Sequence, residues 1–495
     1  MKRTLLAAVA LLLSACTAPT VAPPPAPPPA PAPAPGAAAE QGTPGWEITH
    51  PGREHAIEGY ADRTSALPGD TVRLFVSTTA ARFTVTAFRM GSYTGSAARQ
   101  TWQSGPVPGR VQAPAVVQPP TSTVVAPWQP SLEVPTTGWA PGDYLLRLDG
   151  DNQAQQYVPL TVRTPSNAGR IVLVNAVTTW QAYNRWGGYS LYDSPSGRKA
   201  ERSRAVSFDR PYQARDMQGA GDFSYFELPM VRFAESLGLP LGYATDVDLH
   251  ADPHLLDGAR AVVTLGHDEY WSSAMRANVT AARDRGVNLA FLGGNEIYRH
   301  IRFAPTAVGA DRLEIDYKSF TEDPAHLTDP MEATPEWRSP PFPRPESVLL
   351  GNYYQCNPVH ADLVTANEQN WLLSGIVHNG QHLRGLVGNE YERVDLSVPT
   401  PRPIEVLFHS PVTCGGKPDF ADATYYTTAS GAAVFSAGTQ YWICGLDPGC
   451  PESGADPAVH TAVTAITTRL LRAFADGPTG TTHPATDNLA ALGVH

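Results

Sequence analysis

Residues 259–271 read ARAVVTLGHDEYW, and this stretch constrains the fold more than any other. Its apolar run, 261–265, has the length of one buried strand and stops at Gly266. Polar and aromatic side chains then follow in a single turn, 267–271. In open α/β sheets the chemistry lies just beyond the carboxyl ends of the parallel strands. We therefore expect a functional site at this turn.

The surrounding segments alternate between strand and helix patterns. Strands are predicted over 170–174, 239–244, 261–265 and 287–292, and helices over 226–237 and 272–285. This alternation is typical of an α/β fold with a doubly wound, mostly parallel sheet. Beyond Asp316, strands are predicted over 347–350, 383–387, 404–408 and 433–437, with a helix over 460–475. We interpret that half as β-rich decoration on the same sheet.

A different pattern precedes this part of the chain. Between 46 and 163, short alternating strands follow turn signals, and strands are predicted over 71–76, 82–89, 131–134, 144–148 and 156–162. The pattern indicates a β-sandwich of immunoglobulin-like size, although a Cys…Trp…Cys signature is missing. Its most distinctive piece, 89–93 (RMGSY), is predicted to be a packed strand end.

The first residues indicate export. Lys2 and Arg3 precede an apolar run over 5–13, which is typical of a secretory signal and too short to span a bilayer as a mature helix. The Leu-Ser-Ala-Cys ending resembles a bacterial lipobox, which implies cleavage before Cys16 and a lipid on its thiol. The alternative is an ordinary signal peptide with an incidental cysteine. We expect a lipoprotein anchored to the bacterial cell membrane.

The sequence thus predicts five segments. They are a signal peptide with lipidated Cys16 (1–16), a disordered Pro/Ala-rich linker (17–44), the β-sandwich (45–165), the α/β domain (166–480) and a C-terminal tail (481–495). The linker cannot bury a core, so it should form an extended spacer.

Charge and missing motifs exclude several functions. A net charge of −11 without a basic stripe argues against nucleic-acid binding. The sequence contains no Gly-x-Ser-x-Gly elbow, no phosphate loop, no complete dinucleotide fingerprint and no His-Glu-x-x-His. Because no cysteine lies between residues 17 and 355, a thiol nucleophile in the sheet strands is excluded.

Four cysteines follow Cys16, and an even number in an exported chain suggests two disulfides. The simplest pairing joins Cys444 to Cys450 and Cys356 to Cys414. Two other pairings remain open on spacing alone.

A loop rich in aromatic residues, 179–193 (TWQAYNRWGGYSLYD), follows the first predicted strand. It should lie at the same sheet edge as Glu269. Five of its aromatic side chains recur at every third position: Trp180, Tyr183, Trp186, Tyr189 and Tyr192. For Trp180, Trp186 and Tyr189 a packing role is expected.

Three stretches, AYNRWGGYSLYD, RAVVTLGHDEYW and LAFLGGNEIYRH, resemble the large subunit of N,N-dimethylformamidase, in its C-terminal domain family. The resemblance runs from about 168 to 480, and the segment with RMG is similar to the domain that often precedes it. It implies an amidohydrolase with a glutamine-amidotransferase-like α/β fold. It also implies one iron ion per chain, held by two tyrosines and one glutamate.

By this resemblance, Tyr183, Tyr192 and Glu269 match the metal ligands, and His267 matches the histidine beside them. Two phenolates and a carboxylate suit a hard cation such as Fe³⁺ better than zinc. Such an ion would polarise an amide and lower the pKa of the attacking water. His267 would orient or deprotonate that water, or stabilise the oxyanion. Asn295, with its neighbour Glu296, is expected to support the site.

One departure from the family follows Tyr192. Where the family follows its Tyr-Asp pair with histidines, this chain follows Tyr192 and Asp193 with Ser-Pro-Ser. The substrate expected is a small non-peptide amide, and the possible protein partners are a small subunit or a second copy of the chain.

Other interpretations remain open at this level. The chain could be a non-catalytic binding or scaffold protein of the cell envelope that keeps the fold without the metal, or a metal-free hydrolase acting through His267 and Glu269. Ligand oxygens more than about 6 Å apart would favour the binding protein. His250 and His254 are expected in a solvated loop, and Asp246 and Asp248 as caps of the next segment.

Overall fold

The computed structural model describes residues 40–213 and 220–494. The predicted signal peptide, Cys16 and most of the predicted linker lie outside the described residues. The linker's last residues contact the sandwich, since Gln41 pairs with Thr94 and the Thr43 N–H donates to Ala98 O at 2.8 Å. Within the described ranges, no helix combines the length and the apolar character needed to cross a membrane.

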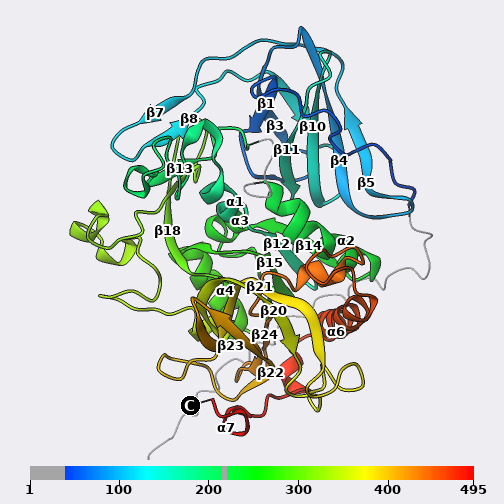
Figure 1. Ribbon diagram of the computed structural model, residues 1–495. Helices are drawn as coiled ribbons and strands as arrows, with labels where there is room; N and C mark the ends of the chain where they lie inside the picture. Colours follow the sequence, from blue (N-terminus) through cyan, green and yellow to red (C-terminus); the bar gives the residue numbers. More distant parts are fainter. Residues whose placement is uncertain (1–39, 214–219, 495) are drawn as a thin grey trace, which may run out of the picture.

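A seven-stranded sheet forms the centre of the α/β part (Figure 1). Its strands, in spatial order, are β14 (Leu241–Thr245), β12 (Ile171–Asn175), β15 (Ala261–Gly266), β17 (Asn288–Gly293), β24 (Ala433–Ser436), β23 (Lys417–Thr427) and β22 (Ile404–Cys414). The first five strands run parallel, and the last two form an antiparallel hairpin beside β24. This topology agrees with the predicted, mostly parallel sheet.

Helices cover both faces of this sheet. One face packs against α2 (Leu228–Ser236) and α6 (Pro457–Asp476), and the other against α3 (Asp246–Ala251), α4 (Ser273–Asp284) and α7 (Leu489–Leu492). Alternate residues of β12 supply the two cores: Ile171 and Leu173 face the first, and Val172 and Val174 face the second. A strand buried on both sides must be apolar at every position, which explains its uninterrupted apolar run.

One predicted element is wrong. Residues 347–350 were expected to form a strand, but they form a short helix, α5 (Ser347–Leu350). Gly351, with a φ of 91°, ends this helix in the left-handed conformation that glycine adopts without strain. A run of four apolar or small residues is too short for its pattern to tell a buried strand from one helical turn. Gly351, which ends the helix, favours the helical turn.

The second half of the chain also forms an antiparallel pair, β20 (Tyr353–Val364) and β21 (His382–Arg393). Both predicted disulfides are confirmed. Cys356–Cys414 joins β20 to β22, and Cys444–Cys450 closes a short loop before α6.

The N-terminal part contains two sheets that share one apolar core, and a separate two-stranded sheet of β7 (Val116–Gln118) and β8 (Thr123–Val125). Of the two that share the core, the smaller contains β1 (Ile57–Ala61), β3 (Thr71–Thr78) and β9 (Leu132–Pro135). The larger contains β2 (Ser65–Ala66), β11 (Gln155–Val162), β10 (Gly142–Gly150), β4 (Arg82–Tyr93), β5 (Ser96–Gln103) and β6 (Val107–Pro108). Leu74 from one sheet and Leu146 from the other meet in the core. The arrangement agrees with a sandwich, whereas an immunoglobulin-like topology remains a prediction.

The sandwich packs directly on the α/β part. Phe88 and Leu145 of the larger sheet share an apolar cluster with Trp180 and Leu228 of the α/β part. A further four-stranded sheet borders the turn that follows β15. Its strands, in spatial order, are β13 (Ala205–Ser207), β19 (Leu313–Ile315), β18 (Arg299–Ala304) and β16 (Tyr270–Ser272).

Candidate metal centre

Tyr183 and Tyr192 lie at the two ends of one loop. α1 (Val177–Tyr183) follows β12 and ends at Tyr183. The Leu191 N–H donates to Ala182 O at 3.0 Å, which returns the chain to the end of α1. As a result the two tyrosine rings stack, with centroids 4.6 Å apart.

Glu269 reaches the same place from the turn after β15, which lies beside β12 in the sheet. Gly266 begins this turn with a φ of 65°, and a Cβ there would collide with Phe226. The Glu269 N–H then donates to Thr179 Oγ1 at 3.0 Å, so α1 fixes the carboxylate-bearing turn. Parallel neighbours therefore deliver both halves of the site to one edge, as predicted.

The three predicted ligand side chains converge. Tyr183 Oη donates to Glu269 Oε2 at 2.7 Å, and the two phenol oxygens are 3.1 Å apart. Tyr192 Oη lies 3.1 and 3.3 Å from the two carboxylate oxygens of Glu269. The carboxylate is buried, whereas both tyrosines are partly exposed. The cluster is therefore anchored in the protein and open on the tyrosine side.

A third phenol and two basic side chains border this cluster. Tyr270 Oη donates to Tyr192 Oη at 2.6 Å, and Lys318 Nζ donates to Tyr270 Oη at 3.0 Å. Arg299 Nε lies 3.5 Å from Glu269 Oε1. Arg299 supplies positive charge beside the anionic oxygens at the centre of the cluster, whereas burial and the neighbouring Arg299 lower the pKa of Lys318 to about 7, so that Lys318 is only partly charged at neutral pH.

His267 stands on the other side of Glu269. Its Nε2 atom lies 3.4 Å from Glu269 Oε2 and 3.5 Å from Glu390 Oε2, without hydrogen-bond geometry to either. Asn295 is a hydrogen-bond partner of Glu390, and its own Oδ1 is buried. Within the described part of the chain, neither His267 Nε2 nor Asn295 Oδ1 has a hydrogen-bond partner. His267 Nε2 is compensated by the two carboxylates, whereas the buried Asn295 Oδ1 is an acceptor left open beside the charged cluster.

The protonation states follow from these contacts. Burial and the Glu269 carboxylate raise the pKa of Tyr183 and Tyr192 well above the usual range. Burial lowers the pKa of His267, but Glu269 and Glu390 outweigh it and raise the pKa to about 9. Burial raises the pKa of Glu269, but the contact with His267 outweighs it and lowers the pKa to about 2. Without a cation the phenols are thus neutral donors to an ionised carboxylate.

The donor set fits a ferric ion. Metal–oxygen bonds of about 2–2.2 Å hold ligand oxygens roughly 3 Å apart, and the oxygens of Tyr183, Tyr192 and Glu269 have this spacing. A trivalent cation favours phenolate over phenol, and two phenolates with one carboxylate would balance its three charges. Tyr183, Tyr192 and Glu269 are the side chains that would hold it.

Several other predicted positions lie apart from this cluster. Asp248 accepts from Thr245 N–H at 2.8 Å in a capping box at the start of α3, which confirms its capping role. Asp246 instead accepts from Thr178 N–H at 3.1 Å and ties α3 to α1. His250 Nδ1 contacts Ser272 Oγ, and His254 Nδ1 contacts Asp257. His250 belongs to α3 rather than to a loop, and neither histidine contacts the tyrosines or Glu269.

Asp268 and Glu296 are buried behind the turn. Glu296 accepts from Thr264 Oγ1 at 2.9 Å, whereas the Asp268 carboxyl has no hydrogen-bond partner among the residues described. Burial and the nearby Glu296 raise the pKa of Asp268 well above its usual range. Asp268 therefore does not belong to the oxygen cluster.

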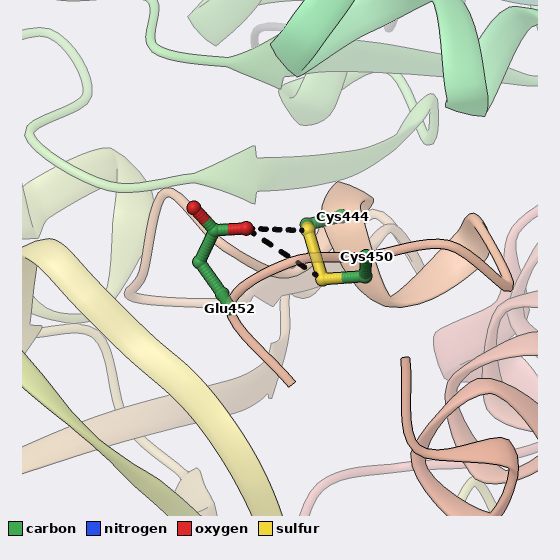
Figure 2. A group of neighbouring side chains, drawn as sticks. All are labelled: Cys444, Cys450 and Glu452. Atoms are coloured by element: carbon green, nitrogen blue, oxygen red, sulfur yellow. Dashed lines mark hydrogen bonds between the residues drawn. A yellow bond between two sulfur atoms is a disulfide. The ribbon is translucent and has the colours of Figure 1, made fainter. Parts of the chain in front are cut away.

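A second group with ligand-like side chains lies near α6, where Cys444, Cys450 and Glu452 meet (Figure 2). The two sulfurs are bonded to each other, so neither offers the thiolate that a metal requires. Glu452 accepts from Tyr225 Oη instead. We therefore exclude this group as a metal site.

The sequence alone did not identify Tyr270, Lys318, Arg299 and Glu390 as part of the site. Lys318 carried one signal, since it is one of four lysines in the chain and stands between aromatic residues. Glu390 carried none, because an acidic residue in a β-rich segment resembles a surface position. Tyr270 adjoins Glu269, and Arg299 lies a few residues after Glu296, so both could have been found from the strand-end rule.

Comparison with known proteins connects this site to a family. A family model described as N,N-dimethylformamidase beta subunit-like, C-terminal, matches residues 84–454, and so begins within the sandwich rather than near 168. No curated protein matches the sequence. A solved Paenibacillus sp. cycloisomaltooligosaccharide glucanotransferase, complexed with cycloisomaltoheptaose, is 11% identical with a TM-score of 0.15. That match covers 28% of this chain and 18% of the other, and it is too slight to inform the fold.

Proposed function

This chain belongs to the N,N-dimethylformamidase beta subunit-like family, and we propose that it is a mononuclear iron amidohydrolase acting on a small, non-peptide amide. The observation that carries the proposal is the convergence of Tyr183, Tyr192 and Glu269 within hydrogen-bond distance. The glutamine-amidotransferase-like and immunoglobulin-like fold assignments belong to the same proposal.

The reaction is the hydrolysis of a C–N bond to a carboxylic acid and an amine. When bound, the ferric ion would supply Lewis acidity toward the amide carbonyl and would lower the pKa of water. The chain's own residues would manage the protons. His267 Nε2 lies 3.4 Å from Glu269 Oε2, and because its pKa is raised to about 9 the imidazole would stabilise the developing oxyanion and donate a proton to the leaving nitrogen.

Glu390 and Asn295 would support that histidine. Glu390 Oε2 lies 3.5 Å from His267 Nε2 and accepts from Gln440 Nε2 at 3.2 Å, so the carboxylate is held in one orientation. Asn295 has a φ of 58° after β17, a strained backbone position for a residue other than glycine. Its unpaired Oδ1 would accept a hydrogen bond from a substrate N–H or from a bound water.

A second function is favoured by the same short distances. Neutral phenols can satisfy Glu269 completely by hydrogen bonding, and the raised pKa values of both tyrosines support that state. The chain would then be a binding or scaffold protein of the cell envelope. The two proposals predict different amounts of iron bound to the purified protein.

The decisive experiment measures iron and visible tyrosinate-to-iron absorption after reconstitution with iron. Wild type should bind about one iron per chain, whereas Tyr183→Phe and Tyr192→Phe should lose the absorption. Tyr189→Phe, on the same loop but outside the cluster, should behave as wild type. Released dimethylamine would report hydrolysis of N,N-dimethylformamide. Wild-type protein with neither absorption nor stoichiometric iron would overturn the iron site and leave the scaffold function.

We also propose that the mature protein is anchored through a lipid on Cys16, and that it associates with a small subunit or a second copy. The Leu-Ser-Ala-Cys ending supports the first statement. Cys16→Ala should move the protein from the membrane fraction to the supernatant, and light scattering of the purified chain would test its association.

A further inference from the structure

Arg210 is fully buried and forms no ion pair with the described carboxylates. Glu314, whose charge acts on Arg210, lies beyond ion-pair distance, and burial raises the pKa of Glu314 well above its usual range. Its exposed fraction is 0%, and none of the carboxylates in the described part of the chain lies within ion-pair distance. It lies just after β13, beyond Phe208 and Asp209, and precedes Pro211. Removing a guanidinium from water without a counter-charge is costly, so this position requires a compensating set of hydrogen bonds.

Those hydrogen bonds all go to main-chain carbonyls of one loop. Nη1 donates to Trp186 O at 3.1 Å and Tyr189 O at 2.9 Å. Nη2 donates to Asn184 O at 3.0 Å, with Gln181 O at 3.5 Å. The four carbonyls span the end of α1 and the loop between Tyr183 and Tyr192. A single planar group therefore fixes the path between the two tyrosines.

Other contacts join the same two segments. Gln181 Nε2 donates to Ser207 O at 2.7 Å, and Asn184 Nδ2 donates to Pro211 O at 2.9 Å. The segment around Arg210 thus forms a template on which the tyrosine loop is built. Burial lowers the pKa of Arg210 to about 10, so the side chain stays charged at neutral pH.

We propose that Arg210 is a positioning residue for the candidate metal centre, which holds Tyr183 and Tyr192 in register before any ion binds. This inference rests on the proposed function. A loop with two glycines, Gly187 and Gly188, has many conformations, and tethering four of its carbonyls removes most of them. The buried charge is then retained for geometry rather than for stability.

The test compares Arg210→Lys with wild type in the metal-free state, by hydrogen–deuterium exchange of residues 184–192. Lysine keeps the charge but cannot reach four carbonyls in one plane. We expect exchange in this loop to become about tenfold faster. After iron reconstitution, the variant should bind iron about tenfold more weakly, and its tyrosinate absorption should shift.

Arg312→Lys is the matched control. Arg312 is also buried, but it pairs with Asp209 and donates to Phe208 O, not to the tyrosine loop. This control should leave exchange over 184–192 and the iron absorption unchanged, even if global stability falls. If residues 184–192 of Arg210→Lys exchange at the wild-type rate, the inference is overturned. Global unfolding of the variant would overturn it too, because Arg210 would then serve overall stability. If wild type binds no iron, the proposed function fails, while the metal-free exchange still decides whether Arg210 holds the loop.

Discussion

Arg89 Nη2 donates to Glu235 Oε1 across 2.6 Å and so joins the sandwich to α2. The same carboxylate accepts from Ser92 N–H at 2.8 Å and from Tyr243 Oη at 2.7 Å. Gly91 makes this approach possible, because a Cβ there would collide with Glu235 Oε2. The RMGSY stretch, predicted as a packed strand end, is therefore a docking motif between two parts of the chain.

Gly91→Ala should weaken this docking. Overpacking against a fixed carboxylate costs about 1–3 kcal/mol, which urea unfolding would measure. Gly105→Ala is the matched control, since nothing lies within 4 Å of a Cβ at that position. The control should change stability by less than about 0.5 kcal/mol. Equal effects of the two substitutions would contradict the docking role.

Part of the site was predictable because it follows from sheet topology. Tyr183 and Glu269 come after β12 and β15, which are parallel neighbours, so their meeting needed no long-range information. Lys318 and Glu390 arrive from segments whose connection to this edge has no local signature. The order of β14, β12 and β15 likewise depends on tertiary packing rather than on any residue pattern.

His267→Asn tests the proton-handling role. We expect kcat/KM to fall by about 10²–10⁴, the range for loss of a general acid–base group, while the iron content stays at the wild-type value. His250→Asn, which removes a histidine bound to Ser272 outside the cluster, should retain full activity. Loss of iron from the His267 variant would instead indicate that the histidine is a ligand.

Tyr270→Phe tests the third phenol. It removes the 2.6 Å hydrogen bond to Tyr192 and the acceptor of Lys318 Nζ. The tyrosinate absorption should shift, and iron affinity should fall by up to about tenfold, since one neutral hydrogen bond contributes about 1 kcal/mol. Complete loss of iron would make Tyr270 a ligand, and an unchanged spectrum would show that it does not influence Tyr192.

The two disulfides should differ in their contribution to stability. They close loops of 58 and 6 residues, and the chain-entropy argument gives about 4 and about 2 kcal/mol respectively. Replacing Cys356 and Cys414 together by alanine should therefore lower the free energy of unfolding more than replacing Cys444 and Cys450. Urea unfolding of both double variants measures the difference, and the reverse order would indicate that packing outweighs loop entropy.

Asp143 should make stability depend on pH. It is buried in β10, and burial raises the pKa of its carboxyl to about 7, against the opposing effects of Thr161 and Arg89. In the unfolded chain the same group titrates near a pKa of about 4. A raised folded-state pKa stabilises the protein fully below about pH 4, and that stabilisation is lost as the pH rises through about 7.

Asp143→Asn removes this dependence while keeping the size of the side chain. Relative to wild type, the variant should gain on the order of 2 kcal/mol in unfolding free energy between pH 5 and pH 8. Asp284→Asn, on the exposed end of α4, controls for general charge effects. A difference between Asp143→Asn and wild type that stays constant with pH would mean that Asp143 is ionised in the folded protein throughout this range. Its partners Thr161 and Arg89 would then outweigh burial.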